Sequence, residues 1–405
     1  MIGNLLFILL LLFSFFPYVT LGGLSGIDSQ PNALIVSLVL FFFYSRSKID
    51  IRLFLLLLVL IVSMLIYIYS FPFTFNSTRS LINYVSLFFV TYVTFEGLKR
   101  TNGLSFNIYK YSVYCWFIVG CVQLFLWSNF LSFLLPRGNS ESTLMTGRGI
   151  VCLAPEPTFY GLMCFMFMII GYINFSDRKS IKYIFMILLI QLIFFSRSSL
   201  CIISLLFVCI LYLFVSFFYM NYKLKIIFLL SGCFVFSISF YVLLNFLNDL
   251  HDYRVGNLLT YLFNNPLEFL FMDASVNERF NHLFFSIYGS VSNYFVPYGY
   301  DSFNDYIKLM HHNSSFNIFF SEYLYGREYI RILSGVGGLL FELGFVGLFP
   351  LYIICNCFFR MIIYDRKILF FFLLFLIVIF AGMPLVTSIV PFTIGNILYL
   401  SLKRK

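Results

Sequence analysis

The side chains best suited to acid–base chemistry are concentrated in one stretch of this sequence, residues 248–334. All four histidines and nine of the seventeen acids lie there. A neutral imidazole can take a proton from a hydroxyl near neutral pH, which makes the adjacent pair His311 and His312 the leading candidates for a general base. Glu156 and Asp273 are the alternatives. The histidine pair has no carboxylates at ligand spacing, so the pattern does not indicate a metal site.

Arginines outside the strongly apolar runs form the second group of candidates, namely Arg148, Arg197 and Arg279. A guanidinium presents a fixed fork of donors that fits a phosphate in a bidentate manner, whereas a lysine is a point charge. The three arginines are therefore candidates for binding an anionic ligand such as a phosphate. The alternative is that they only reach to lipid headgroups at the membrane surface.

The residues around Glu156 predict a helix start. Two prolines flank this acid, which excludes a continuous helix, and Pro157 suits the first turn of the apolar run that follows. The carboxylate is then expected at the positive end of that helix, where it can orient Arg148 or an acceptor sugar, or act only as a cap. Arg197 lies between hydroxyl residues and joins two apolar runs, an arrangement that resembles a phosphate clamp.

A further helix is predicted around Arg279. A serine–glutamate capping box starts it at Ser275, and it is expected to run towards Gly289. At helical spacing Arg279, His282 and Ser286 share one face, with an apolar stripe on another. The pattern predicts an amphipathic helix lying on the membrane surface.

The composition excludes an ordinary soluble domain. The chain has 405 residues, 61% of them hydrophobic and 11% charged, whereas soluble domains carry about 25% charged residues. Runs of about 20 apolar residues recur, which predicts an all-α, polytopic helical membrane protein. Most of the nine cysteines lie inside these runs, so neither a disulfide framework nor a metal site is indicated. The net charge of +9 is explained by basic cytoplasmic connectors rather than by nucleic-acid binding.

The apolar runs predict about twelve transmembrane helices in three parts. Residues 1–247 carry nine helices with short loops, residues 248–334 form a large periplasmic loop containing short helices, and residues 335–405 carry the last three. The positive-inside rule places both termini in the cytoplasm. The predicted spans are 3–19, 31–44, 53–70, 81–98, 108–127, 158–175, 182–195, 200–220, 226–247, 335–358, 368–381 and 385–400.

Several motifs carry a resemblance to a known family. In chain order, the sequence resembles the bacterial Wzy-type polysaccharide polymerases and the related O-antigen ligases over roughly residues 148–350. The motifs are Pro-Glu-Pro-Thr-Phe at 155–159, Ser-Arg-Ser-Ser-Leu at 196–200, Asp-x-Ser-x-x-x-Arg at 273–279, Pro-Tyr-Gly-Tyr at 297–300, His-Asn at 312–313 and Glu-Leu-Gly-Phe-Val-Gly at 342–347.

The resemblance implies a GT-C glycosyltransferase in the bacterial inner membrane, active on its periplasmic face. It would move a glycan from undecaprenyl pyrophosphate to a second lipid-linked repeat unit, with membrane lipids and a chain-length regulator protein as further partners. Arg148, Arg197 and Arg279 would stabilise the charge that develops on the leaving pyrophosphate. No metal, cofactor or nucleic acid is expected.

Two rival functions use similar parts. An O-antigen ligase, which passes glycan to the lipid A core, would use the same donor. A lipid-linked oligosaccharide flippase is expected to carry charged residues deep between its helices. Glu342 is the one acid placed well inside a span, so the sequence favours chemistry at the outer surface over transport.

Overall fold

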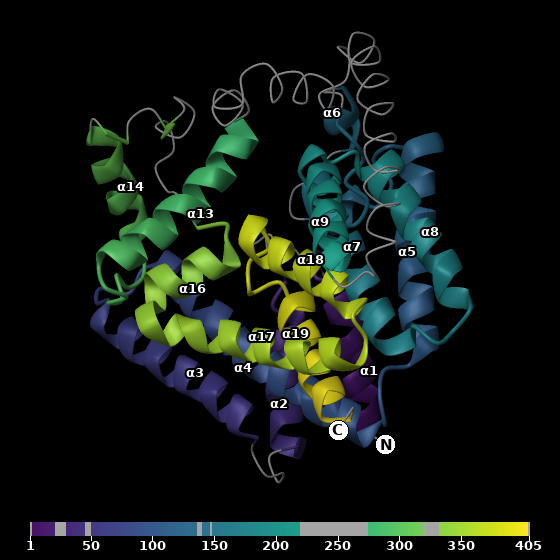
Figure 1. Cartoon of the computed structure of the whole chain (residues 1–405), viewed down its shortest axis with the longest axis horizontal. Helices are drawn as coiled ribbons and strands as arrows, with labels where there is room; N and C mark the ends of the chain where they lie inside the picture. The colour runs from purple at the N-terminus through teal and green to yellow at the C-terminus, as the bar shows by residue number, and fades with distance from the viewer. Residues whose placement is uncertain are drawn as a thin grey trace.

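The computed structural model describes residues 2–20, 30–44, 50–135, 140–145, 148–218, 274–313, 315–316, 319–320 and 332–403. These residues form helices and connectors and contain no strand, which confirms the predicted all-α class. The candidate base Asp273 and the predicted span 226–247 lie outside the described residues. Figure 1 shows the arrangement of the helices.

The helices follow the apolar runs of the sequence. Eleven of the twelve predicted spans coincide with a described helix, and the twelfth is the one outside the description. Their bounds are α1 Ile2–Phe15, α2 Asn32–Tyr44, α3 Ile51–Tyr69, α4 Phe75–Arg100, α5 Phe106–Phe125, α7 Pro157–Phe175, α8 Ser180–Ile190 with its π-helical end η2 Gln191–Ser196, α9 Ser199–Phe218, α16 Gly335–Leu343 with η4 Gly344–Gly347 and α17 Leu348–Tyr364, α18 Ile368–Ala381 and α19 Ile389–Lys403. Shorter helices are η1 Ser132–Leu134, α6 Ser140–Met145, α13 Ala274–Ser292 and α14 Ser302–His312.

Within the described ranges, six helical segments are both long and apolar enough to cross a membrane. They are α3, α4, α5, α7, α9 and the continuous segment Gly335–Tyr364. The other apolar helices are shorter, between 10 and 17 residues. The length and composition of these helices therefore indicate a membrane protein.

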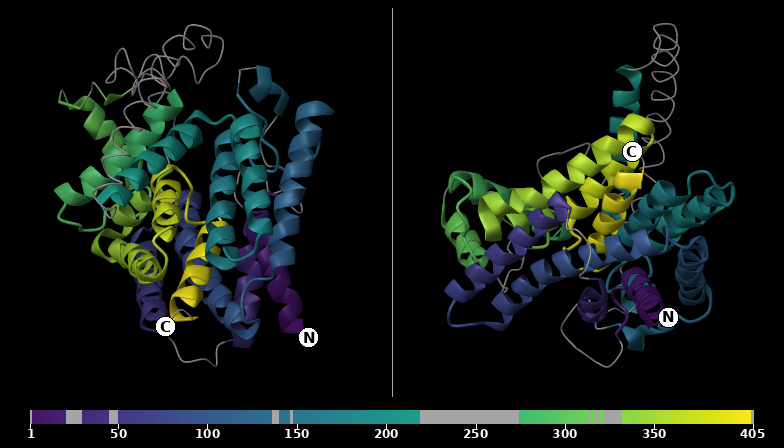
Figure 2. Two further views of the ribbon diagram at one scale, coloured as in Figure 1. Left: turned by 45° about the vertical axis from the view of Figure 1, so that its right-hand side comes forward. Right: turned by 90° about the horizontal axis from the view of Figure 1, so that it is seen from below.

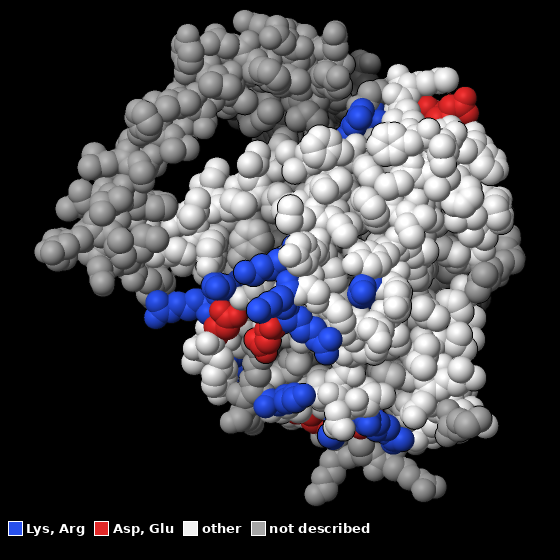
Figure 3. Space-filling model, turned by 90° about the vertical axis from the view of Figure 1, so that its right-hand side faces the viewer, with Lys and Arg blue, Asp and Glu red and all other residues white. Residues whose placement is uncertain are grey.

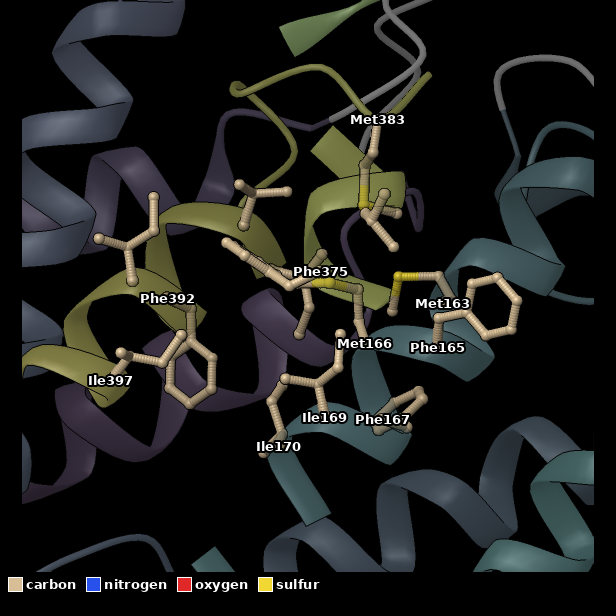
Figure 4. Packing of buried hydrophobic residues seen from close by; sticks show 14 of the residues in the cluster. Met163, Phe165, Met166, Phe167, Ile169, Ile170, Phe375, Met383, Phe392 and Ile397 are labelled. Atoms are coloured by element: carbon tan, nitrogen blue, oxygen red, sulfur yellow. The ribbon is translucent and has the colours of Figure 1, made fainter. Parts of the chain in front are cut away.

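The buried centre of the bundle is made by α7, α4 and α19. In its most apolar window α7 is 83% buried and α4 is 72% buried, whereas α9 is only 11% buried and lies at the periphery. Methionine and phenylalanine side chains of α7 meet Phe375 of α18 and Phe392 of α19 (Figure 4). On α19, Gly395 permits a close approach, because a Cβ there would lie 2.6 Å from the carbonyl oxygen of Thr91 on α4.

The basic connectors are gathered at one end of the bundle. The Tyr172 hydroxyl at the end of α7 donates to Asp365 between α17 and α18, at 2.7 Å. The Arg178 guanidinium lies over the ring of Phe106 at the start of α5, 4.5 Å from its centroid. Figure 3 shows basic side chains over the lower part of one face, with a wide uncharged area above them, and both chain ends lie at the bottom of Figure 1.

The helix predicted around Arg279 is confirmed as α13, and its placement on a membrane surface stays a prediction. Its polar side chains face inward, with Asn281, His282 and Ser286 at most 1% exposed, and the apolar stripe is only half-buried. The reason is the neighbouring helix α16. Its Gly337 leaves room for Ser286, since a Cβ on that glycine would lie 2.1 Å from the serine Oγ.

Candidate functional site

The site begins at the N-terminus of α7, which starts at Pro157 as the sequence predicts. Glu156 is the N-cap, with extended backbone (φ −149°, ψ 155°), and its side chain makes no capping hydrogen bond. It is half-buried. The first amides of α7 therefore point towards the site without a carboxylate of the helix's own cap bound to them.

The N-terminus of α9 lies directly beside that of α7. Ser198, just before α9, has its Oγ 3.4 Å from Oγ1 of Thr158. The Sγ of Cys201 lies 3.6 Å from the carbonyl oxygen of Thr158. A Cβ on Gly161 would come within 2.6 Å of the same sulfur, so the absence of a side chain there permits the approach. Two positive helix ends thus share one location.

Two of the three candidate arginines are brought together here by backbone packing. The amide of Ile150 donates to the carbonyl of Phe195 at 2.9 Å. A Cβ on Gly149 would lie 2.1 and 2.2 Å from the carbonyl oxygens of Phe195 and Ser196, so only glycine allows these two backbone segments to pack this closely. Arg148 and Arg197 are the next residues along each segment.

The local conformation of Arg197 follows from the π-helical end of α8. The residue adopts the left-handed conformation (φ 45°, ψ 29°) immediately after η2. Its Nε donates to the Phe194 carbonyl at 3.1 Å and its side chain is exposed. π-helical turns are rare and frequently occur at functional sites, and here the turn sets the position of an exposed cation between two helices.

Arg279 approaches the same place from α13. Its Nη1 lies against Gly382 at the end of α18, 2.1 Å from where a Cβ on that glycine would be. The guanidinium is also close enough to the buried Cys201 side chain to interact with it electrostatically. Cys201 lies in the first turn of α9, four residues after Arg197, so the Arg279 side chain lies towards the start of α9.

This arrangement is suited to binding a multiply charged anion. Three guanidinium groups and two helix N-termini attract phosphate oxygens, and backbone amides of a helix start bind phosphate directly. Glu156 is the carboxylate nearest to this location along the chain and supplies a group able to accept a proton. Among the described residues, no group of three or more histidine, cysteine, aspartate or glutamate side chains could hold a metal ion.

The structure does not bring the predicted histidine pair to the arginines. His311 and His312 end α14, which lies on the far side of α13 from α7 and α8 in Figures 1 and 2. The His312 Nδ1 is hydrogen-bonded to the carbonyl of Lys308 at 2.7 Å, and the His311 ring contacts Phe320.

His282 is the histidine closest in sequence to Arg279. It is 1% exposed, and its Nδ1 accepts a hydrogen bond from the Leu333 amide at 3.1 Å. Since Nδ1 is the acceptor, the neutral ring carries its proton on Nε2. The helical spacing placed His282 on the face of Arg279, but it gave no sign that this face is buried.

A second polar cluster surrounds Glu342 on α16. Its carboxylate accepts hydrogen bonds from Tyr84 at 2.5 Å and Ser80 at 3.0 Å, both on α4. A cavity of about 20 Å³ lies beside it, enough for one water molecule. The buried Oδ1 of Asn83 in this cavity makes no hydrogen bond to another described residue. The sequence singled out Glu342 as an acid within a span, but not its partners.

No family model matches this chain, and no curated protein matches it either.

Proposed function

We propose that the chain is a polysaccharide polymerase of the bacterial inner membrane, which transfers a glycan from undecaprenyl pyrophosphate to a lipid-linked repeat unit on the periplasmic face. The observation that supports this most is the approach of the three arginine-bearing segments to the paired starts of α7 and α9. A pyrophosphate is the kind of group that such an assembly of guanidinium forks and helix N-termini would hold.

In the proposed reaction, an acceptor hydroxyl attacks the anomeric carbon of the donor. The new C–O bond forms as the bond to the pyrophosphate breaks, and the electron pair leaves with the phosphate oxygen. Arg148, Arg197 and Arg279 stabilise the negative charge that grows there. The apolar surfaces of the helices would hold the prenyl tails, and a protein regulating chain length remains a proposed partner.

Glu156 is the proposed base for the acceptor hydroxyl. It lies at the start of α7 beside the segment that carries Arg148, whereas His311 and His312 lie on α14. His282 is excluded from this role in its present tautomer, because Nδ1 already accepts a hydrogen bond and Nε2 carries the proton.

The rival functions remain distinguishable by experiment. A ligase would use the same arginines. The polar cluster of Glu342, Tyr84 and Ser80 inside the bundle is the observation that favours a flippase, because transport pathways place ionisable groups between helices.

Deleting the gene and separating the cell's surface polysaccharide on a gel tests the three functions. Loss of a polymerase leaves single repeats on the core, loss of a ligase leaves uncapped core with lipid-linked polymer, and loss of a flippase leaves single repeats in the cytosol. Only the first pattern agrees with the proposal.

The arginine site, which consists of Arg148, Arg197 and Arg279, is tested by complementing the deletion with Arg279→Lys. We expect loss of most polymer at unchanged protein level, since an ammonium keeps the charge but not the fork. Arg178→Lys, at the basic end of the bundle, is the matched control and should restore polymer fully. Wild-type chain length with Arg279→Lys would refute the bidentate role.

A further inference from the structure

A groove of about 510 Å³ lies between the C-terminal half of α13, the turn before α14 and α14 itself. Its lining includes three tyrosines, Tyr288, Tyr298 and Tyr306, together with the carboxylate of Asp305. Ser292 and Ser302 also contribute. The volume falls within the range of about 300–1,000 Å³ that is usual for small-molecule sites.

The aromatic wall of the groove is held rigidly. Tyr298 stacks on Phe341 of α16 with ring centroids 4.5 Å apart and planes 2° apart, and its amide donates to the Phe341 carbonyl at 3.0 Å. Tyr306 packs against both rings, at 5.3 and 5.4 Å. On α13, Gly289 permits this, since a Cβ there would lie 3.0 Å from the Tyr306 ring. The wall is therefore formed before any ligand binds.

The polar groups of the groove are mostly acceptors or hydroxyls. Asp305 is exposed, and none of the described side chains that line the groove is basic. The Tyr306 hydroxyl is enclosed in the protein, where burial raises its pKa to about 12, so Tyr306 contributes no negative charge to the groove. A carboxylate repels phosphate, which disfavours a lipid headgroup or a pyrophosphate as the occupant.

These features together match a neutral sugar. The faces of a pyranose ring carry C–H groups whose weak positive charge is attracted to the negative face of an aromatic ring. Its hydroxyls donate to carboxylates and exchange hydrogen bonds with tyrosine and serine. We propose that this groove binds a pyranose residue of a neutral glycan.

The groove is separate from the arginine site. Tyr288 follows Arg279 by nine residues of α13, which is roughly 14 Å along the axis and about half a turn around it. The groove therefore holds sugars remote from the pyrophosphate. That the groove binds a saccharide does not depend on the proposed polymerase function. That this saccharide belongs to the lipid-linked glycan does rest on the proposed function.

The test uses the purified full chain in lipid nanodiscs and the oligosaccharide released by mild acid from the cells' own lipid-linked repeat unit. Mild acid breaks the glycosyl–pyrophosphate bond, so this probe carries no phosphate. Binding is measured by calorimetric titration. We expect the wild type to bind, with at least a roughly tenfold weaker Kd for both Tyr288→Ala and Asp305→Asn.

Matched controls are Tyr69→Ala, an 88% exposed tyrosine at the end of α3, and Asp177→Asn, an exposed acid at the basic end. Both should bind the oligosaccharide as the wild type does. Arg279→Lys should also keep this binding while losing polymer, which separates the groove from the transfer site.

Three results would refute the proposal that the groove binds a sugar. These are no binding by the wild type, equal binding by the Tyr288→Ala and Asp305→Asn variants, or binding that appears in detergent and disappears in nanodiscs because lipid fills the groove. If binding behaves as expected but deletion of the gene leaves the surface polysaccharide unchanged, the groove stands and the polymerase function fails.

Discussion

At the scale of residues, the arginines of the proposed site would bind the pyrophosphate, whereas Glu156 would accept the proton of the acceptor hydroxyl. The role of Glu156 can therefore be tested separately. Glu156 is the N-cap of α7, and its side chain makes no capping hydrogen bond to the helix. For Glu156→Gln we expect polymer formation in isolated membranes to fall by about 100-fold, since an amide keeps the shape but cannot take the proton.

His311→Ala and His312→Ala serve as the comparison, because α14 lies away from α7. Both variants should retain polymer formation near the wild-type rate. If instead either histidine variant is inactive and Glu156→Gln is active, the base belongs to α14, as the sequence pattern first suggested.

A second residue-level prediction concerns the basic end of the bundle. Arg52 donates to both carboxylate oxygens of Asp50, at 2.9 and 3.0 Å, and to Ser401 on α19 at 2.8 Å. The hydrogen bonds from Arg52 lower the pKa of Asp50. Asp50→Asn should cost about 2 kcal/mol of stability, less than the 3–5 of a fully buried pair because the acid side chain is 22% exposed.

The pH dependence of this pair follows from the sign of the pKa shift. The folded-state pKa is the lower one, so the stabilisation is present above the unfolded carboxyl pKa of about 3.9 and is lost as the pH falls through the folded value. The Tm of purified Asp50→Asn should lie a few degrees below that of the wild type at pH 7. The difference should shrink below about pH 4, and a constant difference would contradict the assignment.

At the scale of helices, the sequence predicted where elements lie better than which face each one buries. The apolar runs located the helices, and the proline pair located the start of α7 at Pro157. Periodicity also placed Arg279, His282 and Ser286 on one face of α13. It could not tell that this face is buried, because that depends on the glycines of α16, which belong to another part of the chain.

The contact between α13 and α16 offers a matched pair of substitutions. A methyl group on Gly337 would meet Ser286 Oγ at 2.1 Å, whereas one on Gly338 would meet nothing within 4 Å. Gly337→Ala should destabilise the protein by about 1–3 kcal/mol through overpacking and reduce polymer by shifting α13. Gly338→Ala should be neutral or slightly stabilising, as alanine is the better helix former.

Thermal unfolding of both variants in detergent measures this difference. The two glycines are adjacent on the same helix, so a general effect of alanine on α16 would lower both Tm values equally. Equal Tm values would show that Ser286 does not pack against Gly337.

For the whole molecule, charged residues gather at two opposite ends of the bundle. The basic connectors lie at the end of the bundle that contains Arg178 and Asp365. The candidate arginines lie at the opposite end, where α7 and α9 begin. The sequence predicted basic connectors on one side of the membrane from the positive-inside rule. It could not predict that residue 149 packs against residues 195–196, or that residue 279 packs against residue 382, because no local pattern records contacts between residues so far apart.

The two ends of the bundle are expected to face opposite sides of the membrane. Basic connectors are retained in the cytoplasm, so the arginine site should face the periplasm. In cells with a permeabilised outer membrane, an impermeant maleimide should label Glu141→Cys, on exposed α6, without breaking the inner membrane. Lys179→Cys, in the connector between α7 and α8, should react only after lysis. The parent chain with its nine native cysteines gives the background, and the reverse labelling pattern would place the proposed site in the cytoplasm, where the periplasmic transfer could not take place.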